Sequence, residues 1–149
     1  SIQIDTLVIC PDKLLVYETK NHKGDHLWGP LTFRKPSGAT MENPSLQLNR
    51  TMARLGVLLA ELKIEMPIEG FVVFINPEFN LLSNRKIEEY LLPGQIPRHF
   101  QNFRVKGEIG PEQQRLADAL IRMHNKDRIY RVLCKNYSAV GKCHGRYYV

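Results

Sequence analysis

The stretch that decides the fold is Ile2-Gln-Ile-Asp-Thr-Leu-Val-Ile-Cys-Pro-Asp-Lys-Leu-Leu-Val-Tyr-Glu-Thr-Lys20. It holds two runs rich in β-branched and apolar residues, 2–10 and 13–20, on either side of the turn signal Pro11-Asp12. This pattern predicts the two antiparallel strands of a hairpin. Both strands are apolar on both faces, so we expect them in the middle of an α/β sandwich. One predicted face carries Leu7, Ile9, Leu14 and Val16, and the other carries Ile4, Val8, Leu15 and Tyr17.

The register of the hairpin decides where its charged residues lie. With an even-numbered loop centred on Pro11-Asp12, Asp5 faces Glu18 directly across the two strands. Directly opposed like charges are destabilising, because their Cβ atoms are only about 4.5 to 5.5 Å apart. Lys20 shares the face of Glu18, since strand side chains repeat every two residues, but one lysine neutralises only one carboxylate. An odd-numbered loop would instead pair Asp5 with Thr19 and place the two carboxylates on opposite faces.

A divalent cation is the natural partner for the second negative charge. Mg²⁺ is bound by one or two carboxylates, by waters and by phosphate oxygens. Such an ion polarises a phosphodiester and lowers the pKa of a bound water. The Lys20 ammonium can orient that water or stabilise the negative charge that develops. The hairpin therefore predicts a site for phosphodiester cleavage, with Mg²⁺ as cofactor and Mn²⁺ as an alternative ion.

The rest of the chain predicts a helix and strands around the hairpin. Asn43-Pro44 gives an N-cap residue and a proline at the first helical position, and an apolar stripe at helical spacing continues to about Glu65. Residues 21–43 are expected to be mostly loop with a short strand at 31–34, and 70–75 is expected to be a buried strand that returns after the helix. Further helices are predicted at 85–92 and 111–124, and a strand at 128–134.

Two segments carry a resemblance to a known family. Asp5 followed by Glu18-x-Lys20 on a hairpin is the signature of the PD-(D/E)xK nuclease superfamily. The sequence Gln3-Ile-Asp-Thr-Leu-Val8, followed by Tyr17-Glu-Thr-Lys-Asn-His-x-Gly24, is similar to the NERD (nuclease-related) domain. Asn43-Pro44-x-x-Gln47 and the apolar strand ending in Phe74 also resemble that family, so the resemblance covers about residues 2–92.

The resemblance implies both a fold and a site. The fold would be a restriction-endonuclease-like three-layer α/β sandwich, whose central mixed sheet is built from the hairpin, a crossover helix and a return strand and is flanked by helices. Residues 1–95 would form this core, and residues 96–149 a C-terminal extension with a helix and a basic tail, packed on the same domain. The implied catalytic residues are Asp5, Glu18, Lys20 and Gln47, and the implied metal ligands are Asp5, Glu18 and the backbone carbonyl of Thr19.

Basic and aromatic residues indicate where nucleic acid would bind. All of the net charge of +6 comes from residues 122–149, which contain seven Lys or Arg and one Asp. Such a segment is typical of a surface that contacts phosphates, and equally of an ordinary solvated face. In the loop after the hairpin, His22, His26 and Trp28 can line a substrate groove, or Trp28 can plug the sheet edge. The predicted nucleic-acid contacts are Arg50, Arg54, Trp28, Arg128, Arg131 and Lys135.

The composition limits the class of protein to which the chain can belong. With 149 residues, 43% of them hydrophobic and 24% charged, the chain has the size and composition of one globular domain. Its apolar runs are too short to span a membrane. Three cysteines do not make a disulfide framework, which indicates a reducing compartment, and a cytoplasmic location is expected. Cys134, Cys143 and His144 are spaced too widely for a clear zinc motif, so free thiols are the favoured interpretation.

The sequence thus favours a Mg²⁺-dependent nuclease that hydrolyses phosphodiester bonds in DNA. The first alternative is a catalytically inactive nucleic-acid-binding module of the same fold, and the second is an assembly domain that uses the apolar stripe of the helix. Metal-dependent DNA cleavage would distinguish the nuclease from both alternatives. Salt-sensitive DNA binding would distinguish the binding module from the assembly domain.

Overall fold

A computed structural model describes residues 2–123, 131–134 and 147–148. Within these residues the chain is a mixed α/β fold with two mixed sheets and three α-helices. The main sheet has the strand order β10-β9-β1-β2-β6-β8. Its strands are β1 (Thr6–Ile9), β2 (Leu14–Lys20), β6 (Ile68–Phe74), β8 (Tyr90–Leu91), β9 (Arg131–Cys134) and β10 (Tyr147–Tyr148).

The hairpin of β1 and β2 has the predicted even-numbered register. Thr6 faces Tyr17 and Ile9 faces Leu14 across the antiparallel pair. The turn is closed by a hydrogen bond of 2.9 Å from the Cys10 N–H to the Lys13 carbonyl. The next step of this register before Thr6 places Asp5 opposite Glu18, as the sequence predicted.

Helix α1 (Pro44–Glu61) connects the hairpin to β6, which pairs in parallel with β2. The helix begins as predicted, because the Asn43 side chain accepts a hydrogen bond of 2.8 Å from the Ser45 N–H. It ends earlier than the expected Glu65. Lys63 adopts a left-handed conformation with φ 55°, and the Ile64 N–H donates to the Leu59 carbonyl at 2.9 Å. This Schellman arrangement stops the helix.

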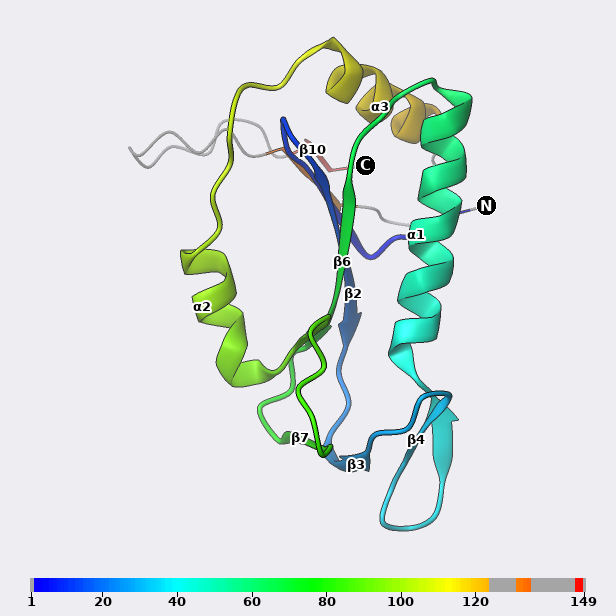
Figure 1. Cartoon of the computed structure of the whole chain (residues 1–149), viewed down its shortest axis with the longest axis vertical. Helices are drawn as coiled ribbons and strands as arrows, with labels where there is room; N and C mark the ends of the chain where they lie inside the picture. The colour runs from blue at the N-terminus through cyan, green and yellow to red at the C-terminus, as the bar shows by residue number, and fades with distance from the viewer. Residues whose placement is uncertain (1, 124–130, 135–146, 149) are drawn as a thin grey trace.

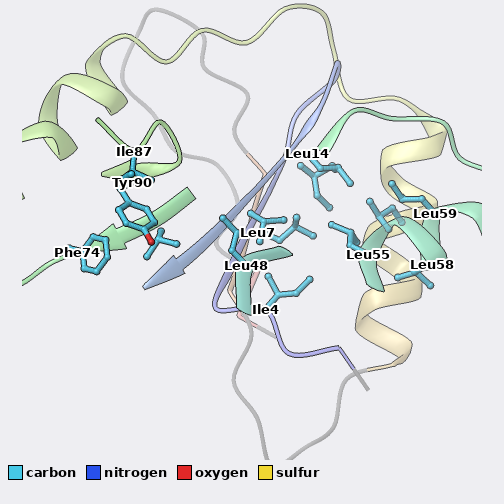
Figure 2. Packing of buried hydrophobic residues seen from close by; sticks show 14 of the residues in the cluster. Ile4, Leu7, Leu14, Leu48, Leu55, Leu58, Leu59, Phe74, Ile87 and Tyr90 are labelled. Carbon is cyan, nitrogen blue, oxygen red and sulfur yellow. The ribbon is translucent and has the colours of Figure 1, made fainter. Parts of the chain in front are cut away.

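The main sheet is covered on both faces, as Figure 1 shows, with α1 on one side and α2 (Ile96–Gln101) on the other. Helix α3 (Pro111–Arg122) contributes Leu116 to the α1 side. Figure 2 shows Leu48, Leu55 and Leu59 directed at the strands, where they pack in one core cluster with Leu7 and Leu14. A separate cluster on the α2 side includes Val8, Leu15 and Tyr17. Ile4, predicted on that second side, packs instead in the α1 cluster.

A second sheet, in the order β5-β4-β3-β7, lies where β2 and β6 end and α1 begins (Figure 1). Its strands are β3 (Gly24–Leu27), β4 (Thr32–Arg34), β5 (Thr40–Glu42) and β7 (Phe79–Leu82). The expected strand at 31–34 is confirmed as β4, and segment 21–43 also contains β3 and β5, two short strands that the sequence did not predict. The strands are very short, and β3 also pairs with the distant β7, a contact that no local pattern shows.

The helix predicted at 85–92 is absent. Residues 85–89 contain only a single turn, in which the Tyr90 N–H donates to the Ile87 carbonyl at 3.1 Å, and Tyr90–Leu91 form β8 beside β6. Tyr90 is drawn into the core, where its hydroxyl donates to Asn43 Oδ1 at 2.6 Å. Leu92 precedes a proline, which disfavours helical backbone, and helix formation begins only with the 3₁₀ turn Pro93–Gln95 and α2.

The C-terminal predictions are confirmed in part. The helix predicted at 111–124 is found as α3, which ends at Arg122, and residue 124 lies outside the described part of the chain. The strand predicted at 128–134 is found at Arg131–Cys134, with residues 128–130 also outside the described part. Strand β9 pairs in parallel with β1. The division of the chain at residue 95 stays a prediction. None of the helices in the described residues is long and apolar enough to cross a membrane.

Candidate active site

The predicted catalytic side chains meet where β2 ends and α1 begins. Glu18 and Lys20 project from β2 toward the α1 face, and Gln47 lies in the first turns of α1. The Lys20 ammonium is 3.1 Å from Glu18 Oε1 and donates to Gln47 Oε1 at 2.8 Å. Glu18 is buried, with 3% of its side chain exposed, and Lys20 is 20% exposed. The structure therefore brings together three residues that lie up to 29 positions apart in the sequence.

Asp5 reaches the same site from the other strand of the hairpin. Its Oδ2 accepts a hydrogen bond of 3.0 Å from the Thr19 N–H. In a continued antiparallel ladder that N–H would donate to the carbonyl of Ile4. The Asp5 carboxylate takes this place, which explains why β1 begins only at Thr6 and why Ile4 turns into the α1 cluster.

The same hydrogen bond indicates the direction of the Thr19 carbonyl. Within a strand, alternate residues direct their N–H and C=O groups to opposite neighbours. Lys20 bonds β6, since its carbonyl accepts from the Ile75 N–H at 3.0 Å, whereas the Thr19 N–H points to the β1 side. The Thr19 carbonyl therefore faces the same side of β2 as its N–H, the side on which Asp5 lies.

The electrostatics of Glu18 reflect this crowding. Burial raises the pKa of its carboxyl group above the usual value, and the charge of Asp5 raises this pKa further. Hydrogen bonds from Lys20 and Gln47, together with the Lys20 charge, act in the opposite direction without cancelling the rise. The site thus holds more negative charge than its own cation balances, so an additional cation would be favoured.

His22 follows Lys20 at the edge of the site and is half-buried. Burial lowers the pKa of its imidazole, and the nearby His26, Lys20 and Lys35 lower this pKa further. His26, by contrast, is 1% exposed and lies against Phe33 and Phe79, with its Nδ1 3.0 Å from the Gly24 carbonyl. It is a core residue and does not line a groove.

The predicted nucleic-acid contacts do not form one surface in the described residues. Arg50 makes a two-pronged ion pair with Glu42 of β5, with both N–O distances 2.8 Å. Arg54 is exposed on α1. Trp28 packs partly buried against the core, with the Arg85 guanidinium 4.7 Å above its ring, which agrees with a plug at the sheet edge. Arg131 lies in β9, whereas Arg128 and Lys135 are outside the described residues.

Metal-ligating residues are sparse elsewhere. The described part of the chain contains no group of three or more His, Cys, Asp or Glu arranged to hold a metal ion. Cys10 is buried in the core on the α2 side of the sheet. Cys134 belongs to β9, and Cys143 and His144 lie outside the described residues. The preference for free thiols over a zinc site at these residues therefore stays a prediction.

The fold and the cluster on β2 define an α/β domain of the nuclease-related class. A family model described as NERD, nuclease-related domain, matches residues 1–75, which include Asp5, Glu18, Lys20 and Gln47. The match covers half of the chain, and the chain belongs to this family. Membership connects it to a nuclease-related function and to nucleic acid in general terms. No curated protein and no solved structure matches the chain.

Proposed function

We propose that this chain is a metal-dependent nuclease domain that hydrolyses phosphodiester bonds in DNA. The observation that carries the proposal is the buried Glu18 carboxylate beside Asp5, with Lys20 as its only salt-bridge partner among the described residues. A structural ion pair alone would not need the second carboxylate. Two opposed carboxylates near one lysine are the donor set expected for a hard divalent cation.

The residues present fit a magnesium ion. Asp5 and Glu18 would supply one carboxylate oxygen each, and Thr19 its backbone carbonyl. Mg²⁺ uses few protein ligands and keeps several waters, so two carboxylates are enough for this site. The lack of any cluster of three or more His, Cys, Asp or Glu in the described residues therefore does not conflict with it. When bound, the ion would polarise the phosphodiester and lower the pKa of a bound water. Mn²⁺ is expected to substitute.

Lys20 and Gln47 complete the proposed chemistry. The Lys20 ammonium is held between Glu18 Oε1 and Gln47 Oε1, so its position is fixed before substrate arrives. A fixed ammonium at this place would orient the attacking water and stabilise negative charge on the phosphate oxygens. Gln47 would act as a positioning residue, because its contact in the structure is with Lys20.

The arrangement of layers supports a restriction-endonuclease-like sandwich. A hairpin in the centre of the sheet is followed by a helix on one face and a parallel return strand next to β2, with α2 on the opposite face (Figure 1). DNA would approach the end of β2 near Arg54 of α1. Arg128, Arg131 and Lys135 are proposed as further phosphate contacts because of their charge. Arg50 would take part only after release from Glu42. The cytoplasmic location stays a prediction.

The test is cleavage of plasmid and linear DNA with Mg²⁺, Mn²⁺ or EDTA. We expect cleavage with either metal, none with EDTA, and a loss of at least about 100-fold in Glu18→Gln and Lys20→Gln, because each removes charge from the reacting centre. The chain provides a matched control in its second Glu-x-Lys triplet, since Glu61 and Lys63 lie exposed at the end of α1. Glu61→Gln and Lys63→Gln should cleave like the wild type.

Two results would overturn the proposal. Cleavage that persists undiminished in Glu18→Gln would come from elsewhere or from a contaminant. Salt-sensitive DNA binding without cleavage under any metal would leave the inactive binding module as the better description.

A further inference from the structure

A groove of about 450 Å³ lies on the face of the main sheet opposite the candidate active site. Its floor includes Leu15 of β2 and Phe71 of β6, and its wall is formed by α2 and residues 102–104. Side chains alternate across a strand, so Leu15 and Glu18 point to opposite faces of the sheet. The groove is therefore separate from the Glu18 cluster, and its volume lies within the roughly 300 to 1,000 Å³ usual for small-molecule sites.

The groove has an excess of positive charge. Of its cations, Lys13 is paired with Glu69 at 3.3 Å and Lys86 with Glu88 at 3.5 Å. Arg98 and Arg104 have no carboxylate partner among the residues the structure describes. Arg104 is nevertheless held in place, because its Nη1 donates to the carbonyls of Gln101 and Phe103 at 2.7 and 2.9 Å. Guanidinium groups of this kind favour phosphate oxygens, which they contact through several N–H donors.

The groove also has an aromatic lining. Phe71 and Phe103 are partly exposed in it, beside His99. Phe71 is stacked on Tyr17 at 5.6 Å with an interplanar angle of 21°, and His99 meets Phe71 edge-on at 4.7 Å. A hydrogen bond of 2.8 Å between the Tyr17 hydroxyl and His99 Nε2 fixes this arrangement. Rigid aromatic rings of this kind provide a surface on which a planar base stacks.

We propose that this groove binds a nucleoside monophosphate, with its phosphate at Arg98 and Arg104 and its base against Phe71 and Phe103. An inorganic anion would use only the arginines, and an uncharged aromatic molecule would leave both guanidinium groups unneutralised. A nucleotide matches both the arginines and the aromatic rings of the groove. It arrives either as a free nucleotide or as the 5′-phosphorylated end of a single strand, and it binds without a metal ion.

Calorimetric titration of dAMP into the full chain in EDTA tests the proposal. We expect saturable binding at one site, weakened about tenfold or more in Arg98→Ala and in Arg104→Ala, as for the loss of a hydrogen bond to a charged group. Both arginines are exposed, so neither change should disturb folding. Arg115→Ala, which removes an exposed arginine of α3 outside the groove, is the matched control and should bind dAMP like the wild type.

Three further titrations decide between the possible ligands. Adenosine and inorganic phosphate should each bind at least tenfold more weakly than dAMP. Equal affinity for phosphate would overturn the base contact, and equal affinity for adenosine would overturn the phosphate contact. A 5′-phosphorylated oligonucleotide that displaces dAMP would identify the strand end as the source, and failure to displace it would identify the free nucleotide. Absence of dAMP binding would refute the proposal.

The outcome is independent of the proposed nuclease activity. Glu18→Gln should retain full dAMP affinity, because Glu18 lies on the other face of the sheet. Loss of dAMP binding in that variant would contradict the separation of the two sites.

Discussion

Asn43 should be one of the most sensitive polar positions of the chain. Only 2% of this residue is exposed. Its Oδ1 accepts from the Ser45 N–H at 2.8 Å and from the Tyr90 hydroxyl at 2.6 Å, and its Nδ2 donates to the Gly29 carbonyl at 2.7 Å. One side chain therefore connects the start of α1, strand β8 and the loop before β4. The start of α1 in turn positions Gln47 against Lys20.

The expected cost of Asn43→Ala follows from these contacts. Loss of an N-cap costs about 0.5 to 2 kcal/mol. The Tyr90 hydroxyl and the Gly29 carbonyl lose a partner inside the protein, at about 1 to 3 kcal/mol for each group that stays unsatisfied. Gly29 and Ser45 are partly exposed, so water can replace some of the lost hydrogen bonds. We therefore expect a total loss of about 2 to 4 kcal/mol in the free energy of unfolding.

Urea unfolding followed by far-UV circular dichroism measures this loss from the midpoint and slope of the transition. Asn80→Ala is the matched control, because the exposed Asn80 side chain donates to the exposed Asp25 at 3.1 Å and has no other hydrogen bond among the described residues. It should change stability by less than about 0.5 kcal/mol. The reasoning would be refuted if Asn43→Ala were no more destabilising than Asn80→Ala, or if its effect and that of Tyr90→Phe were simply additive.

Three further predictions concern the active site, the core and the α1 surface. Because burial raises the pKa of Glu18, its ionisation costs stability, so in EDTA the wild type should lose stability relative to Glu18→Gln as the pH rises from about 4 to 7. Gly70→Ala should destabilise the protein by about 1 to 3 kcal/mol, because its new Cβ would lie 2.9 Å from a Leu48 carbon. Gly56→Ala should stabilise the protein by about 0.5 to 1 kcal/mol, because a Cβ at this position of α1 meets open space. Arg54→Ala should reduce the slope of log K against log salt for DNA binding by about one.

Each of these predictions has an opposite outcome that would count against it. Wild-type stability that grows with pH relative to Glu18→Gln would mean that Lys20 outweighs the burial of the carboxylate. Equal effects of the two glycine substitutions would show that α1 does not approach β6 as closely as described. An unchanged salt slope in Arg54→Ala would place the phosphate contacts away from α1.

The central elements could be predicted from the sequence because their signals are local. Pro11-Asp12 marked the turn, and counting residues from an even-numbered loop placed Asp5 opposite Glu18. The odd-numbered loop stayed open until the register of the structure excluded it. Asn43-Pro44 fixed the start of α1, and with it the position of Gln47. The grouping of Lys20 with Gln47 then needed only the family resemblance.

The remaining features depend on contacts between distant segments. Strand β3 is four residues long and pairs with β7, about 55 positions later, so neither shows a strand pattern of its own. Tyr90 lies in β8, where its hydroxyl donates a hydrogen bond to Asn43 Oδ1. This contact with a distant residue outweighs the helical pattern at 85–92. The pairing of Arg50 with Glu42 and the groove beside α2 depend in the same way on the folded arrangement.

The location of a bound divalent ion tests the central claim most directly. Crystals of the full chain soaked in excess Mn²⁺ and measured at the manganese absorption edge would reveal the ion by its anomalous scattering. We expect a peak between the carboxylates of Asp5 and Glu18, within coordination distance of the Thr19 carbonyl, and no such peak in Glu18→Gln. A wild-type map without density between the two carboxylates, at a manganese concentration that fills other sites, would contradict this expectation.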